Sequence, residues 1–132
     1  MTGFPGETEI EFQETLEFIR RMPFTYLHVF TYSERPGTPA ASMPGQVPWE
    51  VRKERTRRLR HMAAEKNAAF RRRMVGRTLS AVTLDNGKAL TGNYLQVHLA
   101  RPRPANQIID VQVGALAPDG MAEAGVLAVI SG

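Results

Sequence analysis

The segment 49–73, WEVRKERTRRLRHMAAEKNAAFRRR, most constrains the fold because it contains neither glycine nor proline. Its residues are mostly strong helix formers, so it predicts one long helix. Val51, Leu59, Met62 and Phe70 mark a narrow apolar stripe along this helix. We therefore expect it to dock along one side and to leave its cationic side in water.

Basic residues are concentrated in this same segment. Residues 49–73 hold ten basic and three acidic side chains, net +7, while residues 1–48 have net charge −3 and residues 74–132 net zero. A concentrated basic surface attracts polyanions, of which nucleic acid is the commonest. Charge alone leaves open whether the segment binds nucleic acid or is a solvated helix face without a partner.

The segment before the basic helix shows part of a βαβ pattern. Thr8 and Glu11 form a capping-box pair, and Phe12, Leu16 and Ile19 lie on one face of a helix predicted over 8–21, with Phe18 widening that face. Residues 24–30 predict a strand buried on both faces, as in a parallel sheet. Residues 1–7 look like the end of another strand that runs into a turn. One helix and two strands cannot cover such a sheet, so the chain is expected to be part of a larger fold. Residues 32–48, rich in proline, predict a long ordered loop.

The C-terminal part changes to the two-residue period of strands. Strands are predicted at 75–84, 94–99, 107–113 and 126–130, with an Asn-Gly hairpin turn at 85–88 and a turn at 118–120. This pattern indicates a small antiparallel barrel, similar in size to OB or SH3 folds. The predicted class for the chain is α+β.

Several kinds of site are excluded by composition. The chain has no cysteine, so it has no disulfide, thiolate zinc site or cysteine-held iron–sulfur cluster. His28, His61 and His98 are far apart in sequence, so no metal site is expected. No apolar run approaches 18 residues and no signal peptide is visible, so we expect a cytoplasmic location and no membrane partner.

Particular strings in the sequence resemble one enzyme family. The GFPGET string at 3–8 resembles a turn of radical-SAM enzymes that modify tRNA. The strings LHVF at 27–30, YS at 32–33 and RPGTPAA at 35–41 resemble the late barrel segment of MiaB-like methylthiotransferases. The string VGR at 75–77 resembles the start of their TRAM domain, and Asn93-Tyr94 also fits that small RNA-binding barrel.

The resemblance implies a C-terminal fragment with three parts. Residues 1–48 would be the end of the radical-SAM TIM-like barrel, residues 49–73 a connecting helix, and residues 74–132 the TRAM barrel. The parent would use S-adenosylmethionine and two 4Fe-4S clusters to add a methylthio group to C2 of the modified adenosine 3′ of the anticodon. The spelling is most like the threonylcarbamoyladenosine branch, with isopentenyladenosine second.

The fragment itself is expected to bind tRNA through the anticodon stem-loop. It would bind none of these cofactors alone, hold no catalytic residue and be inactive. Surfaces of residues 1–48 would be exposed to non-native self-association. The alternative is a stand-alone, non-enzymatic TRAM-type RNA-binding protein.

The resemblance also implies two sites in residues 1–48. Gly3, Gly6 and Glu7 would contact S-adenosylmethionine in the parent, unless they form a plain strand-to-helix turn. Tyr32, Ser33, Arg35 and Thr38 would form a substrate loop. Arg35 could pair with a phosphate or a carboxylate, since guanidinium binds both bidentately, or could tie the loop down through backbone carbonyls.

RNA contacts are predicted at basic residues of the helix and at polar residues of the barrel. Tyr94 could stack on an unpaired base or could be a half-buried strand residue. The helix residues could instead be solvated or pair with acids of the parent. The predicted set is Arg52, Lys53, Arg55, Arg57, Arg58, Arg60, Arg71, Arg72, Arg73, Arg77, Lys88, Asn93, Tyr94, Arg101 and Arg103.

Overall fold

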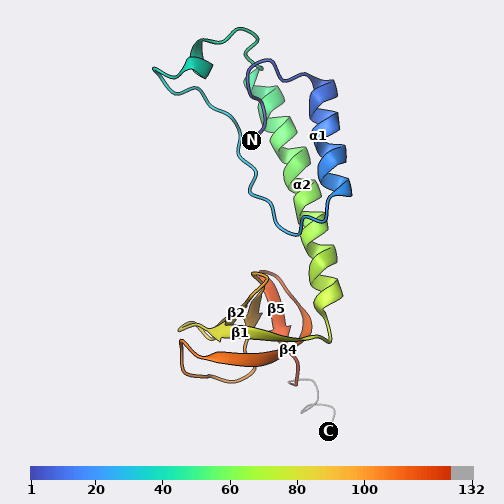
Figure 1. The fold of residues 1–132 in the computed structure, drawn as a ribbon, viewed down its shortest axis with the longest axis vertical. Helices are drawn as coiled ribbons and strands as arrows, with labels where there is room; N and C mark the ends of the chain where they lie inside the picture. The colour runs from blue at the N-terminus through green and yellow to red at the C-terminus, as the bar shows by residue number, and fades with distance from the viewer. Residues whose placement is uncertain (126–132) are drawn as a thin grey trace. The chain divides into compact units, whose positions relative to one another are not determined.

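The computed structural model describes residues 1–125, which form an α+β fold. The chain divides into two compact units, one of residues 1–68 and one that begins at residue 69 (Figure 1). The long helix α2 (Trp49–Met74) contributes residues to both units. The strand predicted at 126–130 lies outside the described residues. None of the helices in the described part combines the length and apolar character that a bilayer crossing requires.

Helix α1 (Glu9–Arg21) confirms the helix predicted at 8–21. The Thr8 hydroxyl accepts the Glu11 backbone N–H at 3.1 Å and donates to the Glu11 carboxylate at 3.1 Å. The cap therefore joins the two predicted residues, and the Thr8 hydroxyl is both donor and acceptor in it. Phe12, Leu16 and Ile19 are buried as predicted, but Phe18 is 49% exposed and packs near Phe24 instead of widening the buried face.

The segment 24–30 is extended but forms no strand, so the predicted strand buried on both faces is wrong for this chain. Its alternate residues Thr25, Leu27 and Val29 are partly or fully buried, whereas Phe24, Tyr26, His28 and Phe30 are exposed. The reason is that helices cover only one side of this segment, so the side chains on its other side are exposed. Its continuation pairs in parallel with the start of the chain, through the bridge between Thr2 and Thr31.

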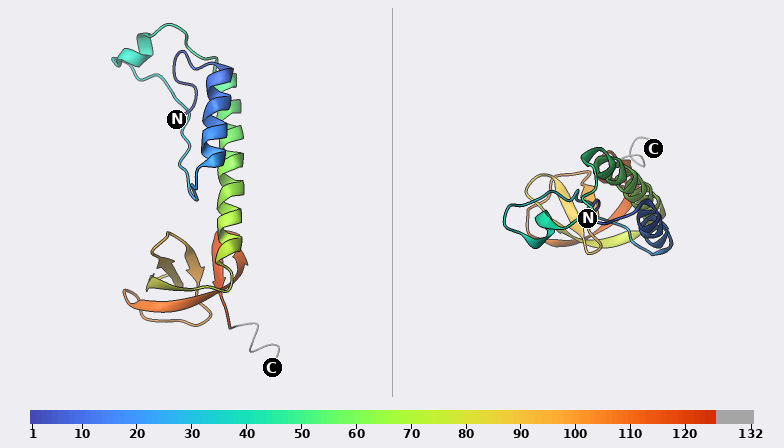
Figure 2. Two further views of the ribbon diagram at one scale, coloured as in Figure 1. Left: turned by 45° about the vertical axis from the view of Figure 1, so that its right-hand side comes forward. Right: turned by 90° about the horizontal axis from the view of Figure 1, so that it is seen from above.

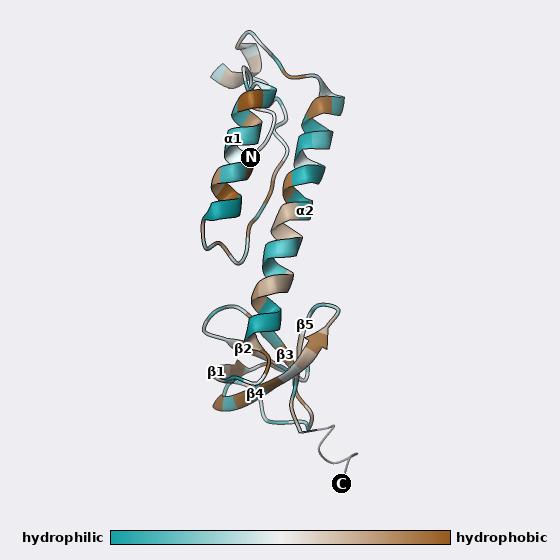
Figure 3. Ribbon diagram, turned by 90° about the vertical axis from the view of Figure 1, so that its right-hand side faces the viewer, coloured by the Kyte–Doolittle hydropathy of each residue, from teal (hydrophilic) through white to brown (hydrophobic). Residues whose placement is uncertain are grey.

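The first unit packs α1 and the extended segment against α2 (Figures 1 and 2). The two helices run parallel. Near the start of α1, Glu9 accepts a hydrogen bond from Arg58, and at its end the carbonyls of Arg20 and Met22 accept from Lys66, which lies further along α2. Between the extended segment and α2, residues 32–48 form the predicted loop, which contains the short 3-10 helix η1 (Pro39–Ser42). Apolar bands interrupt hydrophilic ones along both helices (Figure 3). The core of this unit consists of Phe12, Leu16, Ile19, Val29, Leu59 and Met62.

The second unit is a closed five-stranded barrel, which confirms the predicted small barrel. Its strands are β1 (Thr78–Thr83), β2 (Lys88–Thr91), β3 (Gln96–His98), β4 (Ile108–Ala117) and β5 (Gly120–Glu123). They pair in the order β1-β2-β3-β5-β4, and every pairing is antiparallel except that of β3 with β5. The core combines buried residues of the barrel with the last turns of α2: Phe70, Met74, Ala81, Ala89, Leu95, Val97, Val111, Val113 and Met121.

Several features of the barrel differ from the prediction. Strands β2 and β5 were not predicted, and β3 pairs with β5 in parallel, whereas the predicted barrel was antiparallel. Strand β5 follows directly on the turn at 118–120, where the sequence predicted no strand. It fits there because Gly120 packs against β3, and a Cβ on Gly120 would lie 2.3 Å from the Gln96 carbonyl oxygen. Tyr94 and Leu95 precede β3 instead of belonging to it, and Tyr94 has a left-handed φ of 65°.

Candidate functional site

The GFPGET string forms a tight turn that leads into α1. Gly3 and Gly6 have φ values of +80° and +87°, which favour glycine at both positions. At Gly3 a Cβ would also lie 2.5 Å from Cγ of Arg52, so no side chain fits there. The Gly3 backbone N–H donates to the Glu7 carboxylate at 2.9 Å. The turn is therefore closed by its own acidic residue.

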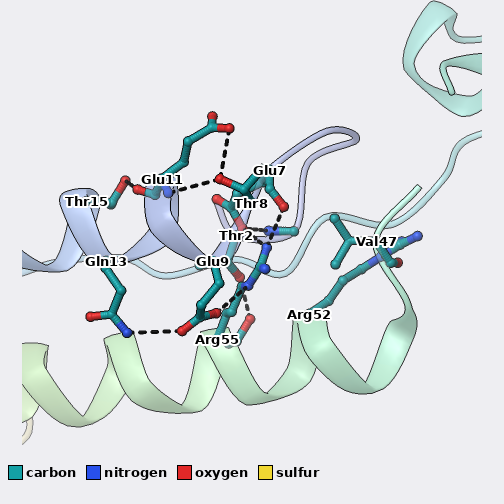
Figure 4. A network of polar contacts seen from close by, with 12 residues as sticks. Thr2, Glu7, Thr8, Glu9, Glu11, Gln13, Thr15, Val47, Arg52 and Arg55 are labelled. Atoms are coloured by element: carbon teal, nitrogen blue, oxygen red, sulfur yellow. Dashed lines mark hydrogen bonds and ion pairs between the residues drawn. The ribbon is translucent and has the colours of Figure 1, made fainter. Parts of the chain in front are cut away.

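Glu7 is held by a second, buried partner from α2. Arg55 donates to the Glu7 carboxylate and to the Glu7 carbonyl, both at 2.9 Å, and its Nε lies 3.4 Å from the Glu9 carboxylate (Figure 4). The Arg55 side chain is only 6% exposed. One Glu7 oxygen thus accepts from both Gly3 and Arg55. Cofactor contact at Gly3, Gly6 and Glu7 stays a prediction.

Three threonine hydroxyls join the first unit at its centre. The Thr56 hydroxyl of α2 lies 2.6 Å from the Thr2 hydroxyl and 2.6 Å from the Thr31 hydroxyl. Thr2 and Thr31 are the residues of the parallel bridge, whose backbone bonds run from Thr2 to Phe30 and from Tyr32 to Thr2. This hydroxyl chain fixes the start of the chain, the extended segment and α2 together.

Arg52 binds the loop that follows the extended segment. It is 4% exposed and donates to the carbonyls of Val47 at 2.6 Å and Tyr32 at 3.2 Å, and to the Glu34 carboxylate at 2.5 Å. This hydrogen bond holds the pKa of Glu34 below its usual value. The expectation that the cationic side of the helix lies in water is therefore wrong at Arg52 and Arg55, because both satisfy buried oxygens.

Polar side chains of α2 take the place of a neighbouring strand for the extended segment. Arg60 donates to the Val29 carbonyl at 3.1 Å and Asn67 to the Thr25 carbonyl at 2.8 Å. With Arg52 and Thr56, these residues form what we call the polar stripe. It satisfies backbone groups that a further strand would otherwise pair with.

The predicted substrate loop lies beside a pocket of about 420 Å³. Tyr32 is 8% exposed, whereas Ser33, Arg35 and Thr38 are exposed. The Thr38 hydroxyl donates to the Arg35 carbonyl at 2.7 Å, which fixes the turn between them. All four residues line the pocket, together with Phe30.

The other predicted RNA-contact residues of α2 differ in whether their side chains are already engaged by ion pairs or hydrogen bonds within the chain. Arg58 pairs with Glu9 at 2.7 Å and lies over the Phe12 ring, and Arg71 donates to the carbonyls of Ala117 and Gly120. Lys53 and Arg57 are exposed and pair with acids three residues earlier, Glu50 and Glu54. Arg72 and Arg73 are exposed and make no side-chain hydrogen bond or ion pair with residues 1–125.

Tyr94 is the most exposed aromatic residue of the barrel, at 82%, which excludes the half-buried alternative. It lies in the turn between β2 and β3. The neighbouring Asn93 amide contacts the sulfur of Met74 at 3.8 Å, and the Arg77 backbone N–H donates to the Met74 carbonyl. Met74 thus joins the Tyr94 turn to the end of α2 and the start of β1. We call the exposed residues around it, Arg73, Arg77, Asn93 and Tyr94, the Tyr94 patch.

The remaining predicted RNA-contact residues of the barrel are Lys88, Arg101 and Arg103, and among residues 1–125 none of them makes a hydrogen bond or ion pair with the Tyr94 patch. Lys88 pairs with Asp119 at 2.9 Å, and Arg103 pairs with Glu123 at 2.9 Å. Asp119 also accepts from His98 at 2.7 Å, and the hydrogen bonds from His98 and Lys88 lower the pKa of Asp119 to about 2. Arg101 is exposed in the loop between β3 and β4. The part of the chain that the structure describes contains no cluster of three metal-ligating side chains.

Sequence reasoning missed Thr2, Thr56 and Glu34 as residues that hold the site. Thr56 carried a signal, because it is a threonine among strong helix formers and lies four residues from both Arg52 and Arg60. Glu34 is the only acidic residue of the 32–48 loop, and this predicts a basic partner for it. Nothing local marks Thr2.

Curated proteins similar to this chain are tRNA-modifying enzymes by name, although no family model matches. The threonylcarbamoyladenosine tRNA methylthiotransferase MtaB of Aquifex aeolicus (strain VF5) is 34% identical over 113 residues, which are 86% of this chain and 28% of that protein. The tRNA-2-methylthio-N(6)-dimethylallyladenosine synthase of Sphingopyxis alaskensis is 36% identical over 98% of this chain and 31% of its own length. The synthase of that name in Erythrobacter litoralis is 46% identical over 67% of this chain and 20% of its own length.

The chain spans less than a third of the length of each of these relatives. The similarity includes both units, because one match covers 98% of the chain. The relatives carry the names of both substrate branches that the sequence motifs suggested. The chain is thus homologous to part of the MiaB-like tRNA methylthiotransferases and belongs to that family, as its motifs predicted.

Proposed function

We propose that this chain is the tRNA-binding C-terminal part of a methylthiotransferase. The parent would add a methylthio group to C2 of the modified adenosine 3′ of the anticodon, with S-adenosylmethionine and 4Fe-4S clusters as cofactors. The relatives' names support a tRNA substrate. N6-threonylcarbamoyladenosine is the favoured substrate and N6-isopentenyladenosine the second. The clusters would be held outside this sequence, which has no cysteine.

The Tyr94 patch is the observation that carries the RNA-binding role. Its aromatic ring is exposed on the turn whose Asn93 contacts Met74, and the exposed arginines Arg73 and Arg77 lie one residue before and three residues after Met74 in the sequence. Stacking on a flat side chain is how proteins commonly bind unpaired bases, and arginines beside it contact phosphates. An anticodon loop offers both unpaired bases and phosphates. The left-handed backbone at Tyr94 holds the ring on a short turn outside the barrel.

The test is binding of this chain to an anticodon stem-loop and to an unrelated hairpin of equal length, across a salt series. Tyr94→Ala should reduce the preference for the stem-loop, because stacking contributes about 1–3 kcal/mol per base. The double substitution Arg73→Gln and Arg77→Gln should make the plot of log K against log salt less steep. The slope should become less negative by about 0.7–0.9 for each lost phosphate contact.

Tyr26→Ala is the matched aromatic control, since Tyr26 is 64% exposed in the first unit. Arg57→Gln is the matched cation control, since this exposed arginine is already paired with Glu54. Neither control should change the binding. Equal affinity for both hairpins, unaltered by Tyr94→Ala, would refute an anticodon-presenting role.

A further inference from the structure

Thr91, the last residue of β2, uses all its polar atoms to hold the turn that carries Tyr94. Its backbone N–H donates to the Leu95 carbonyl at 2.9 Å, and its carbonyl accepts the Tyr94 N–H at 3.1 Å. Its hydroxyl accepts the Leu95 N–H at 2.9 Å and donates to the Asn93 side-chain oxygen at 2.5 Å. Thr91 is 4% exposed, so water does not compete for these bonds. One buried hydroxyl thus bridges the turn.

The turn that Thr91 holds is strained at Tyr94. The φ of 65° lies in the left-handed region, which is unfavourable for a residue with a bulky side chain. The Tyr94 ring is 82% exposed, so its packing against the barrel does little to offset this strain. Strain of this kind persists only where the surrounding structure fixes it, and it is typical of functional positions.

A second threonine of the barrel holds a turn in the same way without a bulky residue. Thr83 ends β1, and its hydroxyl donates to the Pro104 carbonyl at 2.6 Å and accepts the Gln107 N–H at 2.9 Å. The left-handed residue of this turn is Asn106, with a φ of 62° and its N–H bonded to the Thr83 carbonyl at 2.8 Å. Asparagine tolerates this backbone conformation. A threonine-held turn therefore does not need a tyrosine, and the exposed ring of Tyr94 has a use outside the turn.

We propose that Thr91 is a positioning residue for RNA, whose hydroxyl holds the Tyr94 ring ready to stack on an unpaired base before RNA binds. Thr91 itself is buried, so it acts through Tyr94 and not by contact with RNA. Without the hydroxyl, the turn relaxes toward backbone conformations that are normal for tyrosine. The apparent Kd then rises as the fraction of the binding-competent turn falls. This inference rests on the proposed function of the Tyr94 patch.

The test compares variants of the 132-residue chain by their preference for the anticodon stem-loop over the unrelated hairpin. Thr91→Val keeps the shape of the side chain and removes the hydroxyl. The preference should fall about tenfold, the factor by which left-handed strain favours the relaxed turn. Thr91→Ser keeps the hydroxyl and should keep the preference.

Thr83→Val is the matched control for a loss of barrel stability. It removes an equally buried hydroxyl that also ends a strand and also accepts a backbone N–H at 2.9 Å. It should destabilise the barrel and leave the preference unchanged. A Thr91→Val chain whose preference is unchanged, or falls no further than that of Thr83→Val, would overturn the proposal.

NMR of the free chain measures the position of Tyr94 without RNA. A left-handed φ brings the amide and α protons of Tyr94 close together, so their NOE should be strong in the parent sequence and in Thr83→Val and weaker in Thr91→Val. If Thr91→Val does not fold, Asn93→Ala removes the acceptor of the Thr91 hydroxyl and should weaken the same NOE. An unchanged NOE in that variant would overturn the proposal.

The ring variant Tyr94→Ala distinguishes the two possible failures. Loss of the preference in Tyr94→Ala but not in Thr91→Val would overturn the positioning role alone and leave the proposed function standing. An unchanged preference in Tyr94→Ala would refute both.

Discussion

The hydroxyl chain of Thr2, Thr56 and Thr31 gives a sharp test of what holds the first unit together. Thr56→Val keeps the shape of the side chain and removes both 2.6 Å hydrogen bonds. The Thr2 hydroxyl would keep only its long contact of 3.5 Å with the Phe30 carbonyl. The substitution therefore isolates the hydrogen bonds from the packing.

The expected loss follows from the burial of these groups. Thr2 is 1% and Thr56 is 3% exposed, so water does not replace the lost bonds. Two hydrogen bonds at about 1 kcal/mol each, raised by the unpaired hydroxyls and lowered by roughly 0.8 kcal/mol for the added methyl group, give about 2 kcal/mol. This loss of unfolding free energy is about thirtyfold in the unfolding equilibrium constant.

Urea unfolding followed by the fluorescence of Trp49 measures this effect, because Trp49 is the only tryptophan and lies in the first unit. Thr15→Val is the matched control: Thr15 is also a helical threonine, but its hydroxyl is exposed and bonds only to the Glu11 carbonyl. That control should lie within about 0.5 kcal/mol of the parent sequence. A Thr56→Val variant as stable as Thr15→Val would show that the hydroxyl chain contributes no net stability.

Two further predictions concern one turn in each unit. Gly3→Ala should destabilise the first unit by about 3 kcal/mol, through left-handed strain and a clash with the pinned Arg52, whereas Gly6→Ala, with open space around it, should cost about 1 kcal/mol; equal losses in urea unfolding would contradict the packing argument. The pKa of Asp119 is lowered from 3.8 to about 2, chiefly by His98, so its stabilisation is present above about pH 4 and is lost as the pH falls through 2. In an acid titration of barrel unfolding, the difference in stability between Asp119→Asn and the parent sequence should therefore shrink from pH 4 to pH 2, and a constant difference would refute this.

The sequence predicted the elements whose determinants are local. Thr8, Glu11 and the apolar residues of α1 act within one or two helical turns, so their pattern alone predicted the helix. The barrel was predicted because alternation and turn residues are also local. Strands β2 and β5 were missed, because each has only four residues; the pairing of β5 also depends on a close approach at Gly120.

The contacts at the GFPGET turn could not be predicted from local patterns. Arg55 meets Glu7 across 48 positions of sequence, and Arg52 meets Glu34 across 18. A basic residue in a helix looks the same in sequence whether it faces water or a buried carboxylate. Only the fold decides which arginines are buried.

The polar stripe changes how the charge of the basic helix should be understood. At 100° per residue, Arg52, Thr56, Arg60 and Asn67 fall within an arc of about 80°, and this arc faces the extended segment. The positive charge on this side serves backbone oxygens and is not free to bind a polyanion. Within α2, the exposed arginines without a side-chain partner among residues 1–125 lie at the end of the helix, at Arg72 and Arg73, close in sequence to Arg77 of the Tyr94 patch. The salt dependence of RNA binding at the Tyr94 patch should therefore correspond to about three phosphate contacts, from Arg72, Arg73 and Arg77, and not to the ten basic residues of the segment, because counterions are released only where a cation neutralises a phosphate.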